Sequence, residues 1–293
     1  MTLIQELAYI FLPIFIISGL GILWSHLNFS LDGQSIRKLL MNIATPCLIL
    51  DGISKLEVPF SEVAIVMTAS VILLLGCSII GFVLLFLCKL PKTSFLPAIT
   101  FGNAGNIGLP LCFFVYGSEG LGFASAVFLV AVVSQFTLVP ILQGRSPPFK
   151  TILYTPVIYS SVLGIFLLIT ESRLPVPIDV SIALLANLAI PLSLFSLGFG
   201  LAKFRIASLN IALGLGVSRL IIGFSVAFIV NKIVGLNGIA AGVLLIQGAM
   251  PSAIFTYLFS SEYKRNPEDI AGIVLASTLI SIFTLPVIVY YLI

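Results

Sequence analysis

Phe101-Gly-Asn-Ala-Gly-Asn-Ile-Gly-Leu-Pro110 interrupts an apolar, helix-length stretch with two amides, three glycines and a proline. Such a run frees backbone polar groups, which at membrane depth are tolerated only where protein or a water-filled cavity receives them. A helix that is broken at this depth is typical of a binding site. We therefore expect the residues that carry the chemistry of this chain to gather around this break.

The rest of the chain has the composition of a membrane protein. Hydrophobic residues make up 59% of it, charged residues only 9%, and the mean hydropathy is +1.22. About 20 apolar residues are needed to cross the hydrocarbon core. Ten segments are suitable: 6–26, 33–53, 61–88, 94–116, 120–142, 151–170, 179–202, 207–231, 237–260 and 269–292. Because their connections are short, we expect a single membrane domain in an all-α, multi-pass protein of the cell (inner) membrane.

The basic residues are divided unevenly between the two sets of alternating connections. One set holds ten: Arg37, Lys38, Lys89, Lys92, Arg145, Lys150, Lys203, Arg205, Lys264 and Arg265. The opposite set holds three: Lys55, Arg173 and Lys232. Since cytoplasmic loops retain Lys and Arg, this division predicts that both termini are extracytoplasmic. The net charge of +3 is then a topology signal, and no basic face remains for a nucleic-acid partner.

Short motifs recur along the chain at a nearly constant offset. Asn42-Ile-Ala-Thr-Pro46 matches Asn187-Leu-Ala-Ile-Pro191 at 145 residues, and Pro110 corresponds to Pro251 at 141 residues. A third pair, Phe136-Thr-Leu-Val-Pro140 and Phe283-Thr-Leu-Pro286, has an offset of 147 residues at the Phe. The common offset predicts two repeats of five helices, residues 1–142 and 151–293, joined by a cytoplasmic linker at 143–150.

Five is an odd number, so the second repeat must enter the membrane from the opposite side. The sequence thus predicts ten transmembrane helices in two inverted five-helix repeats, an arrangement that places a binding site near the membrane midplane. The fourth and ninth helices would be broken and would cross each other.

The second break is Gln247-Gly-Ala-Met-Pro251. Proline removes an amide donor and glycine admits other backbone angles, so both interrupted helices should split into half-helices. The N-terminal ends of half-helices favour an anion, and amides such as Asn103, Asn106 and Gln247 can orient a carboxylate without carrying charge. The alternative is that each proline only kinks its helix, because Pro and Gly are common in membrane helices.

Several motifs together resemble the auxin efflux carrier family, over nearly the whole chain. They are Gly108-Leu-Pro-Leu111 followed by Tyr116-Gly117, Phe195-Ser-Leu-Gly198, and Gln247-x-Ala-x-Pro251 leading to Glu262-Tyr263 and Pro267. The resemblance implies a fold similar to that of sodium/proton antiporters and bile acid transporters. It also implies a scaffold of helices 1, 2, 6 and 7 and a transport domain of helices 3–5 and 8–10.

The same resemblance assigns individual residues. The crossover asparagine of the family falls on Asn103 and its second-crossover proline on Pro251. The chain lacks the long cytoplasmic loop of the plant members and carries the additional Asn106 and Gly108 of bacterial relatives, which distinguishes it from auxin carriers of plants.

Together these patterns predict a secondary carrier of small organic anions, auxin-like or dicarboxylate, that works by alternating access with an elevator movement. The expected substrate-binding residues are Asn103, Asn106, Gly108, Pro110, Gln247, Pro251, Asn42 and Asn187. No enzyme is expected, because the chain has one histidine and lacks a metal-ligand cluster, a P-loop and a nucleophile elbow. No cofactor and no metal are expected, and lipid and the substrate are the expected partners.

Some alternatives stay open at this point. Arg219, which lies far from the ends of its span, either attracts the anion or compensates the charge of the half-helix ends. Asp51 is either an acceptor for a coupling proton or sodium ion or a solvated residue at a helix end. Cys112 suits an arsenite-type carrier. A membrane-embedded receptor on the same fold would need the same binding site, and the sequence leaves open whether the chain forms a homodimer.

Overall fold

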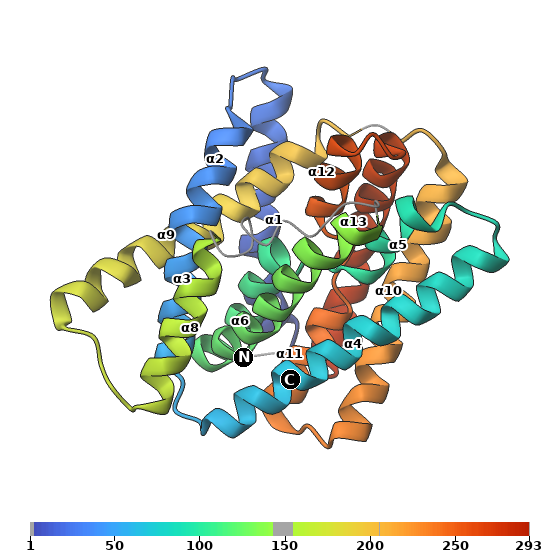
Figure 1. Ribbon diagram of the computed structural model, residues 1–293. Helices are drawn as coiled ribbons and strands as arrows, with labels where there is room; N and C mark the ends of the chain where they lie inside the picture. The colour runs from blue at the N-terminus through green and yellow to red at the C-terminus, as the bar shows by residue number, and fades with distance from the viewer. Residues whose placement is uncertain (1–2, 143–154, 205, 293) are drawn as a thin grey trace. The chain divides into compact units, whose positions relative to one another are not determined.

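The computed structural model describes residues 3–142, 155–204 and 206–292, which are helical almost throughout (Figure 1). The expected linker at 143–150 lies outside the described residues. Within the described ranges, the extended pairing consists of one isolated bridge, between Gly102 and Ser252. The all-α class predicted from the sequence is therefore confirmed.

The chain divides into two compact units, and each takes elements from both halves of the sequence. The first unit contains α1 (Leu3–His26), α2 (Gly33–Leu39), η1 (Leu40–Ala44), α3 (Thr45–Ser54), α8 (Pro156–Ile169) and α9 (Val176–Leu201). The second unit contains α5 (Lys92–Thr100), α10 (Leu209–Val234), α11 (Gly238–Gly248), α12 (Ile254–Glu262) and α13 (Pro267–Tyr290). Three elements have residues in both units: α4 (Phe60–Leu87), η2 (Ala104–Gly108) and α6 (Leu109–Leu142).

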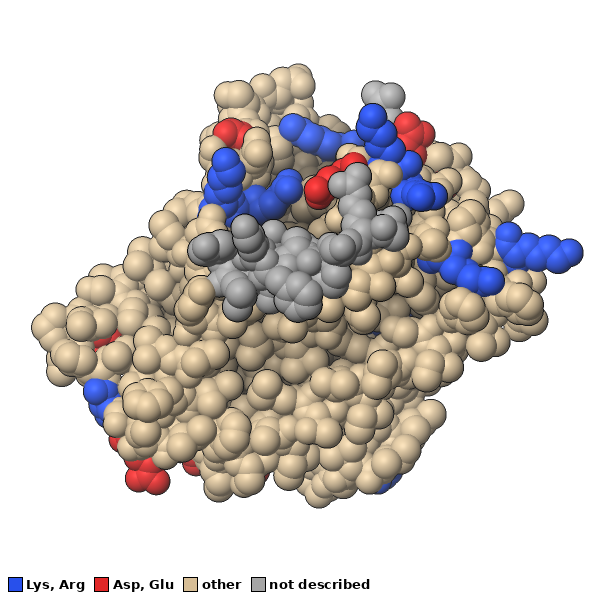
Figure 2. Space-filling view, in the orientation of Figure 1, with Lys and Arg blue, Asp and Glu red and all other residues tan. Residues whose placement is uncertain are grey.

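Six of the described helices are long and apolar enough to cross a membrane. They are Leu7–His26, Phe60–Leu87, Ala104–Leu142, Val176–Leu201, Leu209–Val234 and Pro267–Tyr290. The other expected spans are built differently: 33–53 consists of α2, η1 and α3, and 237–260 consists of α11 and α12. In the expected span 151–170 the described helix is α8, which has 14 residues. Large apolar side chains are exposed along these helices. Figure 2 shows one face of the molecule, and most of that face carries no charged residue.

The segment that was expected to form the fourth and fifth spans bends inside α6. Gly117 has φ 64° and ψ −149°, so the run Leu109–Leu142 consists of two helices with a sharp bend between them. A β-carbon at Gly120 would lie 2.5 Å from the carbonyl oxygen of Cys112, eight residues earlier, which is impossible in a straight helix. Glycine is suited to the bend because it accepts a positive φ.

Two prolines are preceded by a wide turn of π-helix. η1 ends at Ala44, two residues before Pro46, and η2 ends at Gly108, two residues before Pro110. Proline cannot donate to the carbonyl four residues earlier and its ring crowds that carbonyl. A locally widened turn relieves both problems, as π-bulges in helices often do at functional sites.

The first unit contains the four scaffold helices that the family resemblance implies, since α1 packs on α9 and α3 packs on both α8 and α9. In the second unit α10 packs against α13, α11 and α5. One difference from the implied division is that residues 105–129 cluster with the first unit. A physical reason lies at α3, where a β-carbon at Gly52 would touch Leu121 at 3.1 Å and Ser125 at 3.3 Å.

Candidate functional site

The two breaks predicted from the sequence are both present, and they pair with each other in the second unit. One lies between α5 and η2, the other between α11 and α12. The N–H of Asn103 donates to the carbonyl oxygen of Pro251 at 2.7 Å, and the N–H of Ala253 donates to that of Phe101 at 3.0 Å. These two bonds belong to the antiparallel bridge, so the two chain segments pass each other in opposite directions.

The helices that lead to the breaks are about half as long as the hydrocarbon core of a membrane is thick. α5 has 9 residues and α11 has 11 residues, which correspond to about 14 and 17 Å at 1.5 Å per residue. The hydrocarbon core is about 30 Å thick. Helices of these lengths that start at opposite surfaces would end near its centre.

Buried polar groups surround the paired breaks. The side chain of Asn103 is 3% exposed and that of Gln247 is 4% exposed. Ser252, which is fully buried, donates its main-chain N–H to Oγ of Ser277 on α13 at 3.1 Å. The second unit therefore brings together Asn103, Gln247 and Pro251, three of the residues predicted to bind substrate.

The remaining predicted site residues belong to the first unit. Asn42 on η1 and Asn187 on α9 are exposed, and the two elements that carry them pack against each other. Asn106 is half-buried, whereas Gly108 and Pro110 are buried.

Arg219 on α10 is 2% exposed and reaches the ends of both interrupted helices. Its Nη1 donates to the carbonyl oxygen of Ile99 in the last turn of α5 at 3.3 Å. Its Nη2 donates to that of Gly248, the last residue of α11, at 3.3 Å, and Sγ of Cys77 lies 3.9 Å from Nη1. Arg219 forms no ion pair within the part of the chain that the structure describes. Its positive charge thus faces the partial negative charge of two helix C-termini.

The two helices α10 and α11 approach each other closely beside this arginine. A β-carbon at Gly223, one turn after Arg219, would lie 2.1 Å from the carbonyl oxygen of Gly248. Small residues permit such approaches between membrane helices. Gly223 thereby allows α11 to end within reach of the guanidinium.

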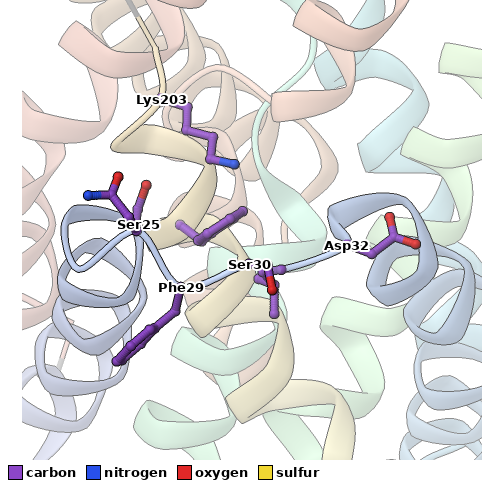
Figure 3. A pocket seen from close by; sticks show the side chains of 8 residues that line it. Ser25, Phe29, Ser30, Asp32 and Lys203 are labelled. Carbon is purple, nitrogen blue, oxygen red and sulfur yellow. The ribbon is translucent and has the colours of Figure 1, made fainter.

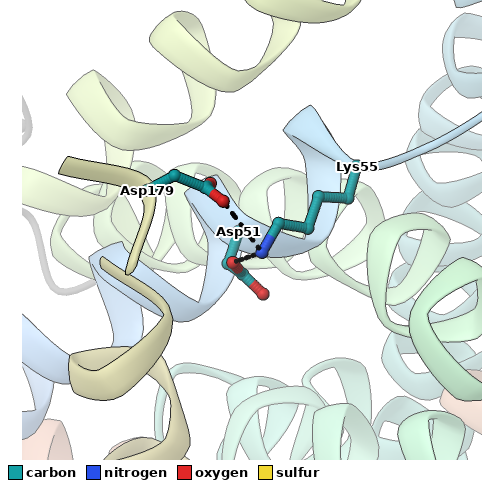
Figure 4. Close-up of polar contacts among 3 residues, drawn as sticks. All are labelled: Asp51, Lys55 and Asp179. Carbon is teal, nitrogen blue, oxygen red and sulfur yellow. Dashed lines mark hydrogen bonds and ion pairs between the residues drawn. The ribbon is translucent and has the colours of Figure 1, made fainter. Parts of the chain in front are cut away.

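Asp51, the candidate acceptor for a coupling ion, already forms an ion pair in the structure. Nζ of Lys55 donates to Oδ1 of Asp51 at 2.5 Å and lies 3.7 Å from Oδ2 of Asp179. Figure 4 shows both contacts as dashed lines. The hydrogen bond to Asp51 raises the pKa of Lys55 above its usual value. The three side chains join the end of α3 to the first turn of α9 within the first unit.

Sequence reasoning missed the contact between Ser252 and Ser277. Ser252 directly follows Pro251, so its place in the second break was a usable signal. Ser277 has no such signal, because it lies inside a regular helix. As for metals, no three His, Cys, Asp or Glu side chains of the described residues lie close enough to hold an ion. Cys112, considered above for arsenite, is buried on α6.

Known membrane transport proteins are similar to nearly the whole chain. A family model described as "Membrane transport protein" matches residues 9–148 and 148–289. An uncharacterized transporter of Methanocaldococcus jannaschii is 25% identical over 268 residues, which are 85% of this chain and 86% of that protein. An uncharacterized transporter of Methanothermobacter thermautotrophicus is 23% identical over 290 residues, 93% of this chain and 91% of that protein.

Plant proteins match over a shorter stretch. A probable auxin efflux carrier component 1b of Oryza sativa subsp. japonica is 26% identical over 182 residues, which are 59% of this chain. The matched stretch is 31% of the length of the rice protein.

Proposed function

The chain belongs to the membrane transport protein family, to which the auxin efflux carriers also belong, and we propose that it is a secondary carrier of small organic anions. The family is one of transporters and not of enzymes. What the family does not supply is the substrate class and the mechanism, which we infer from the geometry of the paired breaks.

The proposal rests on the pairing of the two breaks, in which the main-chain N–H of Asn103 bonds to the carbonyl oxygen of Pro251. The side-chain amides of Asn103 and Gln247 are buried beside this pairing. A helix that stops inside a membrane leaves backbone groups that need a partner, and such places form the substrate sites of carriers. α12 begins after Ala253 without a side-chain cap. Its first N–H groups and the amides of Asn103 and Gln247 are donors from which a carboxylate can accept hydrogen bonds.

Arg219 supports an anionic substrate without binding it directly. Its guanidinium bonds to Ile99 and Gly248, and so keeps a positive charge close to the breaks. In our proposal this charge compensates the helix ends, while the uncharged amides make the contacts to the substrate. A small carboxylate or dicarboxylate fits such a site better than a cation, which the arginine would repel.

For the transport step we propose alternating access with an elevator movement. The chain forms two compact units, and one of them contains both breaks. A movement that exposes the breaks to the two sides of the membrane in turn would need such a division. The orientation with both termini extracytoplasmic remains part of this proposal and rests on the distribution of basic residues.

The test is uptake by purified protein in liposomes. Labelled dicarboxylates, monocarboxylates and indole acids should be offered separately, each with an imposed proton gradient, sodium gradient or neither. We expect at least one carboxylate to accumulate to a higher level than in protein-free liposomes. The gradient that drives this uptake identifies the coupling ion. Binding of a carboxylate without uptake under any gradient would instead favour a receptor on the same fold.

A further inference from the structure

A second polar site lies in the first unit, whereas the paired breaks belong to the second unit. A pocket of about 480 Å³ is formed between the segment that joins α1 to α2 and the end of α9. Its polar lining consists of Ser25, Asn28, Ser30, Asp32 and Lys203. Figure 3 shows Lys203 on the α9 side and Asp32 at the start of α2. Pockets of this volume commonly hold small ligands.

The pocket contains one positive and one negative group that do not neutralise each other. Nζ of Lys203 lies 4.0 Å from the ring centre of Phe199, and among the described residues Lys203 forms no ion pair. Asp32 caps α2, accepting the N–H of Gln34 at 3.0 Å and the hydroxyl of Ser35. These hydrogen bonds, that of the Ser35 hydroxyl foremost, lower the pKa of Asp32, so that its carboxylate is charged at neutral pH.

The wall beside the pocket has the features of a membrane–water interface. Trp24 packs edge-on against Phe29, which lines the pocket, at 4.9 Å, and against Phe195 of α9 at 5.8 Å. Leu23 and Leu27 next to it are 50% and 54% exposed. Tryptophan gathers at the level of lipid headgroups, and apolar side chains beside it face acyl chains. The pocket thus opens where a headgroup would lie.

We propose that this pocket binds the zwitterionic headgroup of a membrane phospholipid that carries a primary ammonium group. Lys203 and the hydroxyl and amide groups of Ser25, Asn28 and Ser30 would bind the phosphate, and Asp32 would accept hydrogen bonds from the ammonium. A headgroup with only negative charge would meet the carboxylate of Asp32. A quaternary ammonium has no N–H to donate to it, so phosphatidylethanolamine fits better than phosphatidylglycerol or phosphatidylcholine.

The single tryptophan of the chain provides the test, because Trp24 contacts the wall of the pocket. The full-length protein is placed in phosphatidylcholine nanodiscs that contain a small fraction of lipid with brominated acyl chains, which quench tryptophan fluorescence. The brominated lipid carries an ethanolamine, choline or glycerol headgroup. We expect the ethanolamine lipid to reach half-maximal quenching at a mole fraction about two- to fivefold lower than the choline lipid, the range for one exposed ion pair.

Three variants test whether the lipid headgroup binds in the pocket or the lipid only contacts the protein surface non-specifically. Asp32→Asn keeps a good helix cap but removes the charge, so the preference for ethanolamine over choline should disappear. Lys203→Gln should weaken quenching by both lipids. Lys232→Gln is the matched control, because Lys232 also lies over a ring, that of Phe228 at 5.7 Å, but does not line the pocket; this variant should behave as the unsubstituted protein.

The proposal is overturned if the three brominated lipids quench equally, if phosphatidylglycerol quenches most, or if Asp32→Asn leaves the preference intact. A further arm adds water-soluble glycerophosphoethanolamine. Failure of millimolar amounts to reverse the quenching assigns the site to the membrane lipid. Reversal at micromolar amounts would assign it to a soluble zwitterion and contradict the lipid assignment.

Discussion

Arg219 donates a hydrogen bond to the carbonyl oxygen of Gly248 at 3.3 Å, and so ties α10 to the last residue of the interrupted helix α11. The same guanidinium bonds to Ile99 of α5, also at 3.3 Å. A planar guanidinium can serve two acceptors at once, which a lysine ammonium does less well. One buried side chain therefore links the ends of both helices that stop at the breaks.

We predict that Arg219→Gln lowers the stability of the protein whether or not substrate is present. Loss of the bonds leaves two buried carbonyl groups without their donors, at a cost of about 1–3 kcal/mol. Thermal unfolding in detergent measures the effect, and Lys232→Gln at the exposed end of the same helix is the control. A stable Arg219→Gln protein with only weaker affinity, relieved by uncharged substrate analogues, would show that Arg219 binds the substrate.

We predict a graded effect at Asn103, whose buried amide lies at the paired breaks. Asn103→Ala should weaken substrate binding by about 1–3 kcal/mol through the loss of a hydrogen bond to a charged group. Asn103→Asp should nearly abolish binding, since it places a negative charge beside an anion. Uptake in liposomes measures both, with Asn237→Asp in the exposed cap of α11 as the control. Normal uptake by folded Asn103→Asp protein would remove Asn103 from the site.

The sequence was sufficient to locate the breaks. Pro110 and Pro251 disrupt a helix through their own chemistry, and the amides of Asn103 and Gln247 stand out among apolar neighbours. The bend at Gly117 was likewise visible as the boundary between two spans. Each of these features is local, so it can be recognised without knowing which other segment lies nearby.

The partners of these residues could not be predicted in the same way. Ile99 is separated from Arg219 by 120 residues, and no helical or repeat spacing connects them. The assignment of residues 105–129 to the first unit depends on close packing at Gly52, which is a tertiary contact. The ion pair of Asp51 was not predicted either, although Lys55 follows it by four residues, a spacing that places both on one helix face.

We predict that Asp51 is not the acceptor of a coupling ion. Its carboxylate is paired with Lys55, so Asp51→Asn should leave the dependence of uptake on proton and sodium gradients unchanged. The loss of a partly exposed ion pair should cost at most about 1 kcal/mol of stability. Asp179→Asn, which affects the longer contact with Lys55, is the matched variant. Loss of gradient dependence in Asp51→Asn alone would restore the coupling role.

We predict that the two ends of the first unit lie on opposite sides of the membrane. The start of α2 and Lys203 line one pocket, whereas Lys55 and Asp179 meet at the other end of α9. In a protein without its natural cysteines, Gln34→Cys should be labelled from the cytoplasm and Ser172→Cys from outside by a membrane-impermeant thiol reagent. Both positions are exposed. Labelling of both from the same side would contradict the topology.

We predict that Ser277→Ala is more damaging than Ser281→Ala, although both serines are buried on α13. Oγ of Ser277 accepts the N–H of Ser252 inside the second break, at 3.1 Å. Among the described residues, Oγ of Ser281 donates to the carbonyl oxygen of Thr278 in its own helix, at 2.7 Å. Removal of the Ser277 hydroxyl leaves a buried N–H of the break without its acceptor, which should cost about 1–3 kcal/mol. Removal of the Ser281 hydroxyl leaves a helix carbonyl that keeps its backbone bond.

The unfolding temperature and the rate of liposome uptake should both decrease for Ser277→Ala and stay near the unsubstituted values for Ser281→Ala. Equal effects of the two substitutions would mean that the hydroxyl of Ser277 does not help to hold the break in place.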